Sequence, residues 1–99
     1  MKYVVSWEAR QNASEELQAR SLEVFGKWSP SEGTTFHQFL GRIDGRGGYA
    51  VVETDDPALL AKDMATFGAF FEMSVHPVME IAETAMIAAE AVEFRASIS

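Results

Sequence analysis

Residues 36–53 read FHQFLGRIDGRGGYAVVE, two apolar runs joined by a glycine-rich turn. Asp44-Gly45 inside this stretch is a strong hairpin signal, because glycine readily adopts the positive φ angles of tight turns. The runs at 35–43 and 48–54 are therefore predicted to be two strands joined by the DGRG turn. These glycines join two predicted strands, whereas a dinucleotide-binding loop joins a strand to a helix. They therefore do not form a dinucleotide-binding loop.

A strand and a helix are predicted before this hairpin. KYVVSWE at 2–8 is rich in β-branched and aromatic residues, which is typical of a strand. The helix that follows has Asn12 as its expected N-cap and Glu15 as the capping-box partner, and Pro30 ends it. Its apolar side is expected to pack on the sheet and carries Leu17, Val24, Phe25 and Trp28.

A helix, a strand and a final helix are predicted after the hairpin. Asp56-Pro57 supplies an N-cap followed by proline at the first helical position. FFEMSVHPVMEI at 70–81 alternates as a strand does, and Pro77 suggests an edge strand or a bulge. The final helix covers about residues 81–95.

This order of elements, β-α-β-β-α-β plus a C-terminal helix, is the ferredoxin-like split βαβ pattern. It predicts one α+β domain over residues 1–99, with two helices on one face of a four-stranded antiparallel sheet. Phe39, Tyr49 and either Phe70 or Phe71 cannot all face those helices. A second copy packed sheet against sheet is the simplest cover, so we expect a homodimer that forms a dimeric α/β barrel.

The predicted C-terminal helix has apolar groups on two sides. Ile81 and Val92 belong to one narrow stripe, whereas Ile87 and Phe94 lie on roughly the opposite side. A helix of this kind usually contacts two things, and a partner subunit is our preferred explanation over a frayed terminus.

Composition and charge exclude several classes of function. The chain has no cysteine, so it can form neither disulfides nor thiolate metal sites, and it holds no cysteine nucleophile. Its net charge of −7 repels phosphate, so we expect no nucleic-acid partner and no anionic membrane surface. MKYVVSWEAR is not a signal peptide, and no run approaches the roughly 20 apolar residues of a membrane span. A soluble, cytoplasmic protein is expected.

Three motifs together are similar to a known family. The chain resembles a small bacterial family of unknown function in WSPSEG at 28–33, GRIDGRGG at 41–48 and ETDDP at 53–57, and also in the later VHPVMEI. The resemblance extends to about residue 82 and leaves the final helix outside. It implies membership of the dimeric α/β-barrel superfamily and a homodimer. That superfamily includes cofactor-independent monooxygenases, muconolactone-type isomerases, haem-handling enzymes and ligand sensors, but no catalytic motif of theirs occurs here.

The two histidines are the natural candidates for catalysis, because imidazole transfers protons near neutral pH. By alternation, His37 is expected to share a face with Phe39 and Ile43, opposite Phe36, Gln38 and Leu40. His76 is expected to share a face with Glu72 and Ser74. Each histidine alone is more typical of an ordinary strand residue, yet we expect at least one to face a cavity.

The remaining candidates would shape a ligand pocket rather than react. Trp7, Trp28, Phe39 and Tyr49 are predicted to line it, with Glu72 as a polar contact. An aromatic face on a strand is equally typical of a core, and core packing is the favoured role of Trp28. Arg42 and Arg46 could hold a carboxylate, but solvation or pairing with Glu53 is the more ordinary expectation.

A metal site and any cofactor are not expected. Non-haem iron would need His37, Glu72 and His76 to converge, although the second and fourth strands are usually opposite edges of such a sheet. No serine nucleophile motif is present.

The function hypotheses are therefore three. The first hypothesis is an enzyme that acts without a cofactor on a small apolar or aromatic molecule, by oxygenation or isomerisation. The second is a protein that binds such a molecule without chemistry, as a sensor would. The third hypothesis is a docking module whose final helix contacts another protein.

Overall fold

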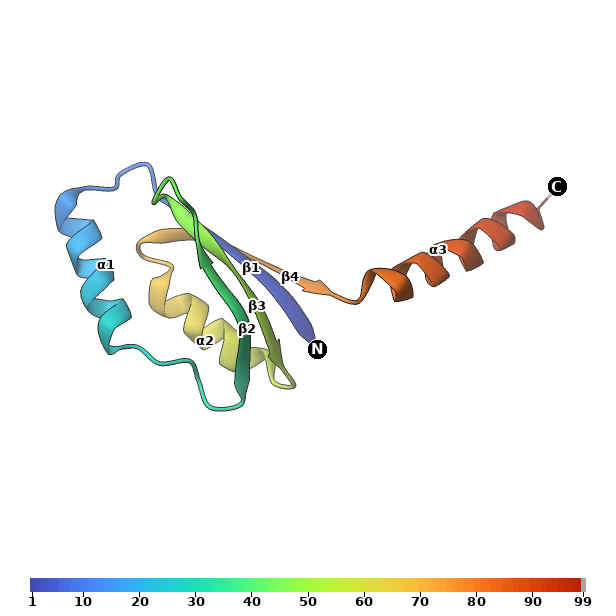
Figure 1. Ribbon diagram of the computed structural model, residues 1–99, viewed down its shortest axis with the longest axis horizontal. Coiled ribbons are helices and arrows are strands. Elements are labelled where there is room, and N and C mark those ends of the chain that lie inside the picture. Colours follow the sequence, from blue (N-terminus) through green and yellow to red (C-terminus); the bar gives the residue numbers. More distant parts are fainter. Residues whose placement is uncertain (99) are drawn as a thin grey trace.

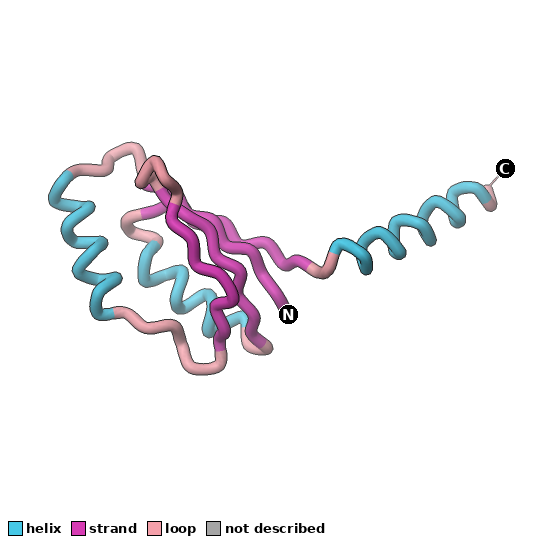
Figure 2. Tube along the Cα trace, viewed as in Figure 1, coloured by secondary structure: helices cyan, strands magenta, loops and turns pink. Residues whose placement is uncertain are grey.

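A computed structural model describes residues 1–98 and has the predicted α+β ferredoxin-like topology. The four strands form one antiparallel sheet in the order β2-β3-β1-β4 (Figures 1 and 2). The elements are β1 (Lys2–Ala9), α1 (Glu15–Lys27), β2 (Thr34–Gly41), β3 (Gly47–Thr54), α2 (Pro57–Phe67), β4 (Phe71–Val78) and α3 (Ile81–Ala96).

Helices α1 and α2 lie on one face of the sheet (Figure 1). The opposite face, here called the open face, is not covered by any described element. Beneath the helices, Val5, Ala50, Val52 and Leu60 form the buried core. Strands β2 and β4 are the two edges, so the edge position predicted from Pro77 is confirmed.

A β-bulge in β2 overturns the predicted facing of this strand. Phe36 lies opposite Val52 and Phe39 lies opposite Ala50, because the register shifts between Phe36 and Gln38. The extra residue in the bulge is His37. Val52 and Ala50 both face the helices, so the bulge turns Phe36 and Phe39 to the same side and leaves His37 on the other. The expectation that His37 and Phe39 share a face was wrong, because simple alternation assumes that no residue is inserted.

The start of α2 was predicted correctly, and the start of α1 was not. The carboxylate of Asp56 accepts a hydrogen bond from the Ala58 amide, as an N-cap does. At α1, the N-cap is Ser14, whose hydroxyl accepts from the Leu17 amide at 3.2 Å, and not Asn12. Ser14 is the N-cap because it directly precedes the first helical residue, and from there its hydroxyl reaches the backbone amide three residues later.

The hairpin is confirmed, and its glycines have separate roles. The loop spans residues 42–46, and Gly45 has a φ of 72°, which an L side chain rarely adopts. Gly48 serves a close approach instead. A Cβ there would collide with the Trp7 ring and with the Leu40 carbonyl. Gly48 therefore lets the Trp7 ring approach the hairpin backbone closely.

Helix α3 leaves the end of β4 and projects away from the sheet and the other helices (Figures 1 and 2). The described molecule is correspondingly elongated, at 62 × 30 × 21 Å. Within residues 1–98, no helix has both the length and the apolar character needed to span a membrane.

Candidate functional site

The site with the most evident binding capacity is a cavity of about 370 Å³ between the helices and the sheet, here called the helix–sheet cavity. This volume lies within the range of small-molecule sites. Its aromatic lining comprises Trp7, Phe25, Trp28, Phe36, Phe39, Phe67 and Phe71. The rest of the lining is Val5, Ser21, Leu22, Leu40, Gly41, Ala50, Met64 and Met73.

Trp28 stands at the centre of the aromatic lining. It ends α1, and its ring meets Phe67 edge to face with centroids 5.1 Å apart. The rings of Phe36 and Phe39 lie 5.9 and 6.3 Å from it. Edge-to-face pairs of this kind add stabilisation beyond their area burial. The cavity wall is therefore a connected cluster of rings rather than a set of independent side chains.

A buried carboxylate holds this wall to α2. Asp63 is only 2% exposed and accepts from the Ser31 hydroxyl at 2.8 Å and the Ser31 amide at 3.2 Å. The indole N–H of Trp28 donates to it at 3.4 Å. Burying a carboxylate is costly unless hydrogen bonds compensate for the lost water. Asp63 thus fixes the loop after α1, and with it the position of Trp28.

The helix–sheet cavity offers very little polar chemistry. Of the described residues that line it, Ser21 supplies the one hydroxyl, and this already donates to the Gln18 carbonyl at 2.8 Å. The rim is apolar as well, since Leu22 is 63% and Phe25 49% exposed. Such a site recognises shape and apolar surface rather than charge.

The predicted site residues separate into two groups on opposite faces of the sheet. Trp7, Trp28 and Phe39 all line the helix–sheet cavity. Tyr49, in contrast, alternates with buried residues of β3 and lies on the open face. Glu72 also lies on the open face, because it is paired with Glu8 one residue from the cavity-lining pair of Trp7 and Met73.

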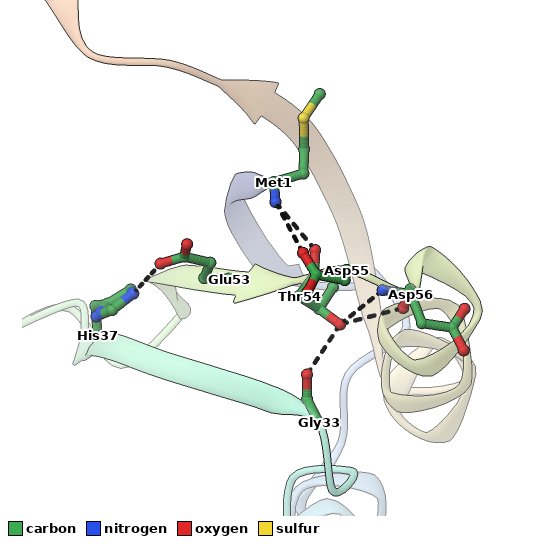
Figure 3. Close-up of polar contacts among 7 residues, drawn as sticks. All are labelled: Met1, Gly33, His37, Glu53, Thr54, Asp55 and Asp56. Carbon is green, nitrogen blue, oxygen red and sulfur yellow. Dashed lines mark hydrogen bonds and ion pairs between the residues drawn. The ribbon is translucent and has the colours of Figure 1, made fainter.

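Both histidines belong to the open face. His37 Nε2 lies 2.7 Å from Glu53 Oε1 (Figure 3). This hydrogen bond is the largest cause of the lowered pKa of Glu53, because it stabilises the ionised carboxylate. His37 is 44% and Glu53 51% exposed, so water still reaches the pair.

The end of β3 next to this pair is firmly tied down. Thr54 is buried, and its hydroxyl contacts the carbonyls of Gly33 and Asp56 and the amide of Asp56 (Figure 3). The terminal amine of Met1 donates to the Thr54 carbonyl at 3.2 Å. These bonds join the starts of β1, β2 and α2, so Glu53 projects from a rigid strand.

His76 is paired with Val4 on β4, and it shares the open face with Glu72 and Ser74 as predicted. His37 and His76 nevertheless lie on opposite edge strands, with β3 and β1 between them. Among residues 1–98, no cluster of three or more histidines and carboxylates is placed to hold a metal ion.

The two hairpin arginines pair with different carboxylates from the one considered in the sequence. Arg42 contacts Asp44, and it also lies 3.6 Å from Glu8. Arg46 lies 3.9 Å from Glu8. Glu53 is instead the partner of His37, because it sits at the far end of β3. The Arg46 amide also donates to Asp44, and this bond is the main cause of the lowered pKa of that carboxyl.

Sequence reasoning missed several parts of the site. Phe25, Phe36, Phe67 and Phe71 were not predicted as site residues, although all four line the cavity. Asp63 was not singled out at all. Its position four residues before Phe67 on the apolar side of α2 was the one available signal, because an acidic residue there needs buried partners.

Comparison with known proteins concerns nearly the whole chain. The family model described as "Domain of unknown function (DUF3303)" matches residues 1–92. The chain belongs to the DUF3303 family. The match reaches well into α3, so the expectation that the final helix lies outside the family was wrong. The DUF3303 match establishes no activity, and none of the curated proteins compared matches the chain.

Proposed function

We propose that this DUF3303 protein binds a small apolar or aromatic molecule in the helix–sheet cavity. The observation that carries the proposal is the cavity itself, about 370 Å³ in volume and lined by seven aromatic side chains. Binding there transfers apolar surface out of water, at about 25 cal/mol per Å². The rings already pack against one another, so little side-chain freedom is lost when the ligand enters.

Binding without chemistry is the better-supported role of this cavity. Acid–base catalysis needs a titratable group within hydrogen-bond reach of the ligand. His37, His76 and Glu72 all lie on the other face of the sheet. The protein in this proposal is a cofactor-free sensor or carrier, and the acidic, cysteine-free chain fits the cytoplasm.

The proposed assembly is a homodimer in which two open faces pack together. Val4 and Val51 are half-buried and lie near the middle of that face. Tyr49 is 50% exposed, and Leu40, which is 54% exposed and also reaches the cavity lining, is paired with Tyr49 on the edge strand. A second copy would remove these apolar groups from water, as the dimeric α/β-barrel resemblance also implies.

One observation favours catalysis as a second candidate. The 2.7 Å contact between His37 and Glu53 resembles a general base oriented by a carboxylate. In the proposed dimer this pair would face the space between the sheets. There it could move a proton in an isomerase or a cofactor-independent monooxygenase. Replacement of His37 by Gln should then abolish turnover of a substrate while leaving cavity binding intact.

The binding proposal is tested with N-phenyl-1-naphthylamine, an uncharged fluorophore that brightens in apolar sites. Ala50→Leu adds volume on the sheet beneath the cavity, and Val51→Leu is the matched control on the open face. Circular dichroism first establishes that both variants fold. We expect Ala50→Leu to weaken binding at least tenfold and Val51→Leu to leave it within about threefold.

A second variant keeps the test decisive if Ala50→Leu does not fold. Leu22→Trp enlarges an exposed side chain on the cavity rim, where it does not disturb the core. It should also weaken or slow binding. Equal affinities for the parent, Leu22→Trp and Val51→Leu would show that the probe binds elsewhere, and the proposal would be wrong.

A further inference from the structure

Helix α3 has no packing partner within its own chain. Every residue from Ile81 to Ala96 is exposed, and the helix points away from the sheet (Figure 1). Isolated helices of this length are marginal in water, because tertiary packing supplies most helical stability in proteins. A contact from outside the chain would account for a helix that its own domain does not support.

The side chains of α3 are suited to such a contact. Ile81 is 83% and Val92 54% exposed on one stripe, and the residues between them on this stripe are alanines. Ile87 and Phe94, on the other side, are 55% and 67% exposed. Leaving this much apolar surface in water is unfavourable, and the small alanines allow a close approach along the stripe.

The link between β4 and α3 directs the helix outward. Only Met79 and Glu80 separate the two elements. Glu80 Oε1 lies 3.1 Å from Lys2 Nζ on β1, which ties the link to the neighbouring strand. Helix α3 leaves the sheet edge and does not turn back across its own open face (Figure 1).

We propose that α3 docks on the body of a second copy of this chain, and that the second copy returns the same contact. This exchange of arms rests on the homodimer proposed above. It assigns the Ile81–Val92 stripe to the surface of the partner subunit. The interaction is reciprocal, as required by a twofold-symmetric dimer.

The area available supports a second copy as the occupant. Four strands of eight residues present a face of about 500 Å², from spacings of roughly 4.8 Å between strands and 3.3 Å per residue. Two such faces bury about 1,000 Å² in total, well below the roughly 1,600 Å² of a standard stable interface.

The arms supply the missing area. Sixteen residues at 1.5 Å each make α3 about 24 Å long and about 10 Å wide, so half its surface is roughly 380 Å². Two docked arms, with the surfaces that receive them, raise the buried total to about 2,500 Å², which is within the range of obligate homodimers. The arms therefore raise the buried area from the lower limit of specific interfaces into the range of obligate homodimers.

The first test compares two variants with the same change in charge. Val92→Lys places a cation in the apolar stripe, and Glu90→Gln makes the same single change in charge on the opposite side of the helix, between Ile87 and Phe94. Lysine is a better helix former than valine, so the helix itself is not weakened. By analytical ultracentrifugation we expect Val92→Lys to raise the dimer dissociation constant at least 30-fold and Glu90→Gln less than threefold.

The second test identifies what α3 contacts. Because the chain has no cysteine, Ser97→Cys can carry a donor dye on one population and Lys62→Cys an acceptor on another. Arm exchange predicts energy transfer on mixing, which is lost on dilution and in chains that also carry Val92→Lys. Transfer found only within doubly labelled single chains would mean that the arm folds back, and would overturn the proposal.

The outcomes separate this inference from the proposed function. A dimer unaffected by Val92→Lys, with no transfer between chains, would refute arm exchange and leave the sheet contact standing. A chain that stays monomeric at high concentration would refute both dimer proposals. Neither result would alter N-phenyl-1-naphthylamine binding, which tests the cavity alone.

Discussion

Asp63→Ala is the substitution whose effect on stability follows most directly from the structure. The carboxylate is 2% exposed and holds the loop after α1 through two hydrogen bonds from Ser31 and a longer one from Trp28. Alanine would leave the Ser31 amide and hydroxyl and the indole N–H without this acceptor in a place where water has little access.

The expected loss is about 3–4 kcal/mol. Hydrogen bonds to a charged group contribute about 1.5–3 kcal/mol each, and two of the three have good geometry. The third, at 3.4 Å, adds little. The free energy of unfolding of such domains is about 5–15 kcal/mol, so about a fifth or more of the total stability depends on this one carboxylate.

Urea denaturation followed by far-ultraviolet circular dichroism measures this loss. Ser31→Ala removes only the 2.8 Å bond and should cost about 1.5–3 kcal/mol. Asp55→Ala is the matched control, because that carboxylate is fully exposed and lies 3.9 Å from the terminal amine, and no measurable change is expected. A loss below 1 kcal/mol for Asp63→Ala would refute the conclusion that Asp63 anchors the cavity wall.

Three further predictions concern the sheet. Glu53→Gln should remove a pH-dependent part of the stability. Because the pKa of Glu53 is lowered in the folded protein, its contribution is present above the ordinary glutamate pKa and is lost as pH falls through the lowered value. In urea denaturation, the difference in free energy of unfolding between the parent and Glu53→Gln should therefore shrink in acid. Deletion of His37 removes the inserted residue and leaves Phe36 opposite Val52 and Phe39 opposite Ala50, so the near-ultraviolet dichroism of the aromatic cluster should be kept; a collapse of that spectrum would contradict the assigned register. Gly48→Ala should destabilise by about 1–3 kcal/mol in thermal melts, because its methyl group would collide with the Leu40 carbonyl and the Trp7 ring, and a neutral result would contradict this close approach to Gly48.

The order of elements and the sheet topology could be predicted because local signals mark each boundary. Asp44-Gly45 marks the hairpin, and Asp56-Pro57 marks the start of α2. The N-cap of α1 was harder, because Asn12 and Ser14 are both good caps and only the surrounding turn selects between them.

The distribution of the site residues over the two faces was only partly predictable. Alternation placed Glu72 and His76 together correctly, because β4 pairs with β1 without interruption. It failed for His37, because one inserted residue inverts every later assignment along a strand. The role of Asp63 depends on Trp28 and Ser31, which lie more than thirty positions away in sequence and which no local pattern connects to it.

The bulge at His37 also disfavours edge-to-edge pairing of sheets from different molecules. A free sheet edge exposes unpaired amides and carbonyls, and it can template strand after strand from other chains. Strand β2 interrupts any such ladder with its inserted residue, and β4, at the opposite edge, has no N–H to offer at Pro77. Both routes to a continuous fibril are thereby obstructed, and a crowded solution of this protein should resist amyloid-like aggregation.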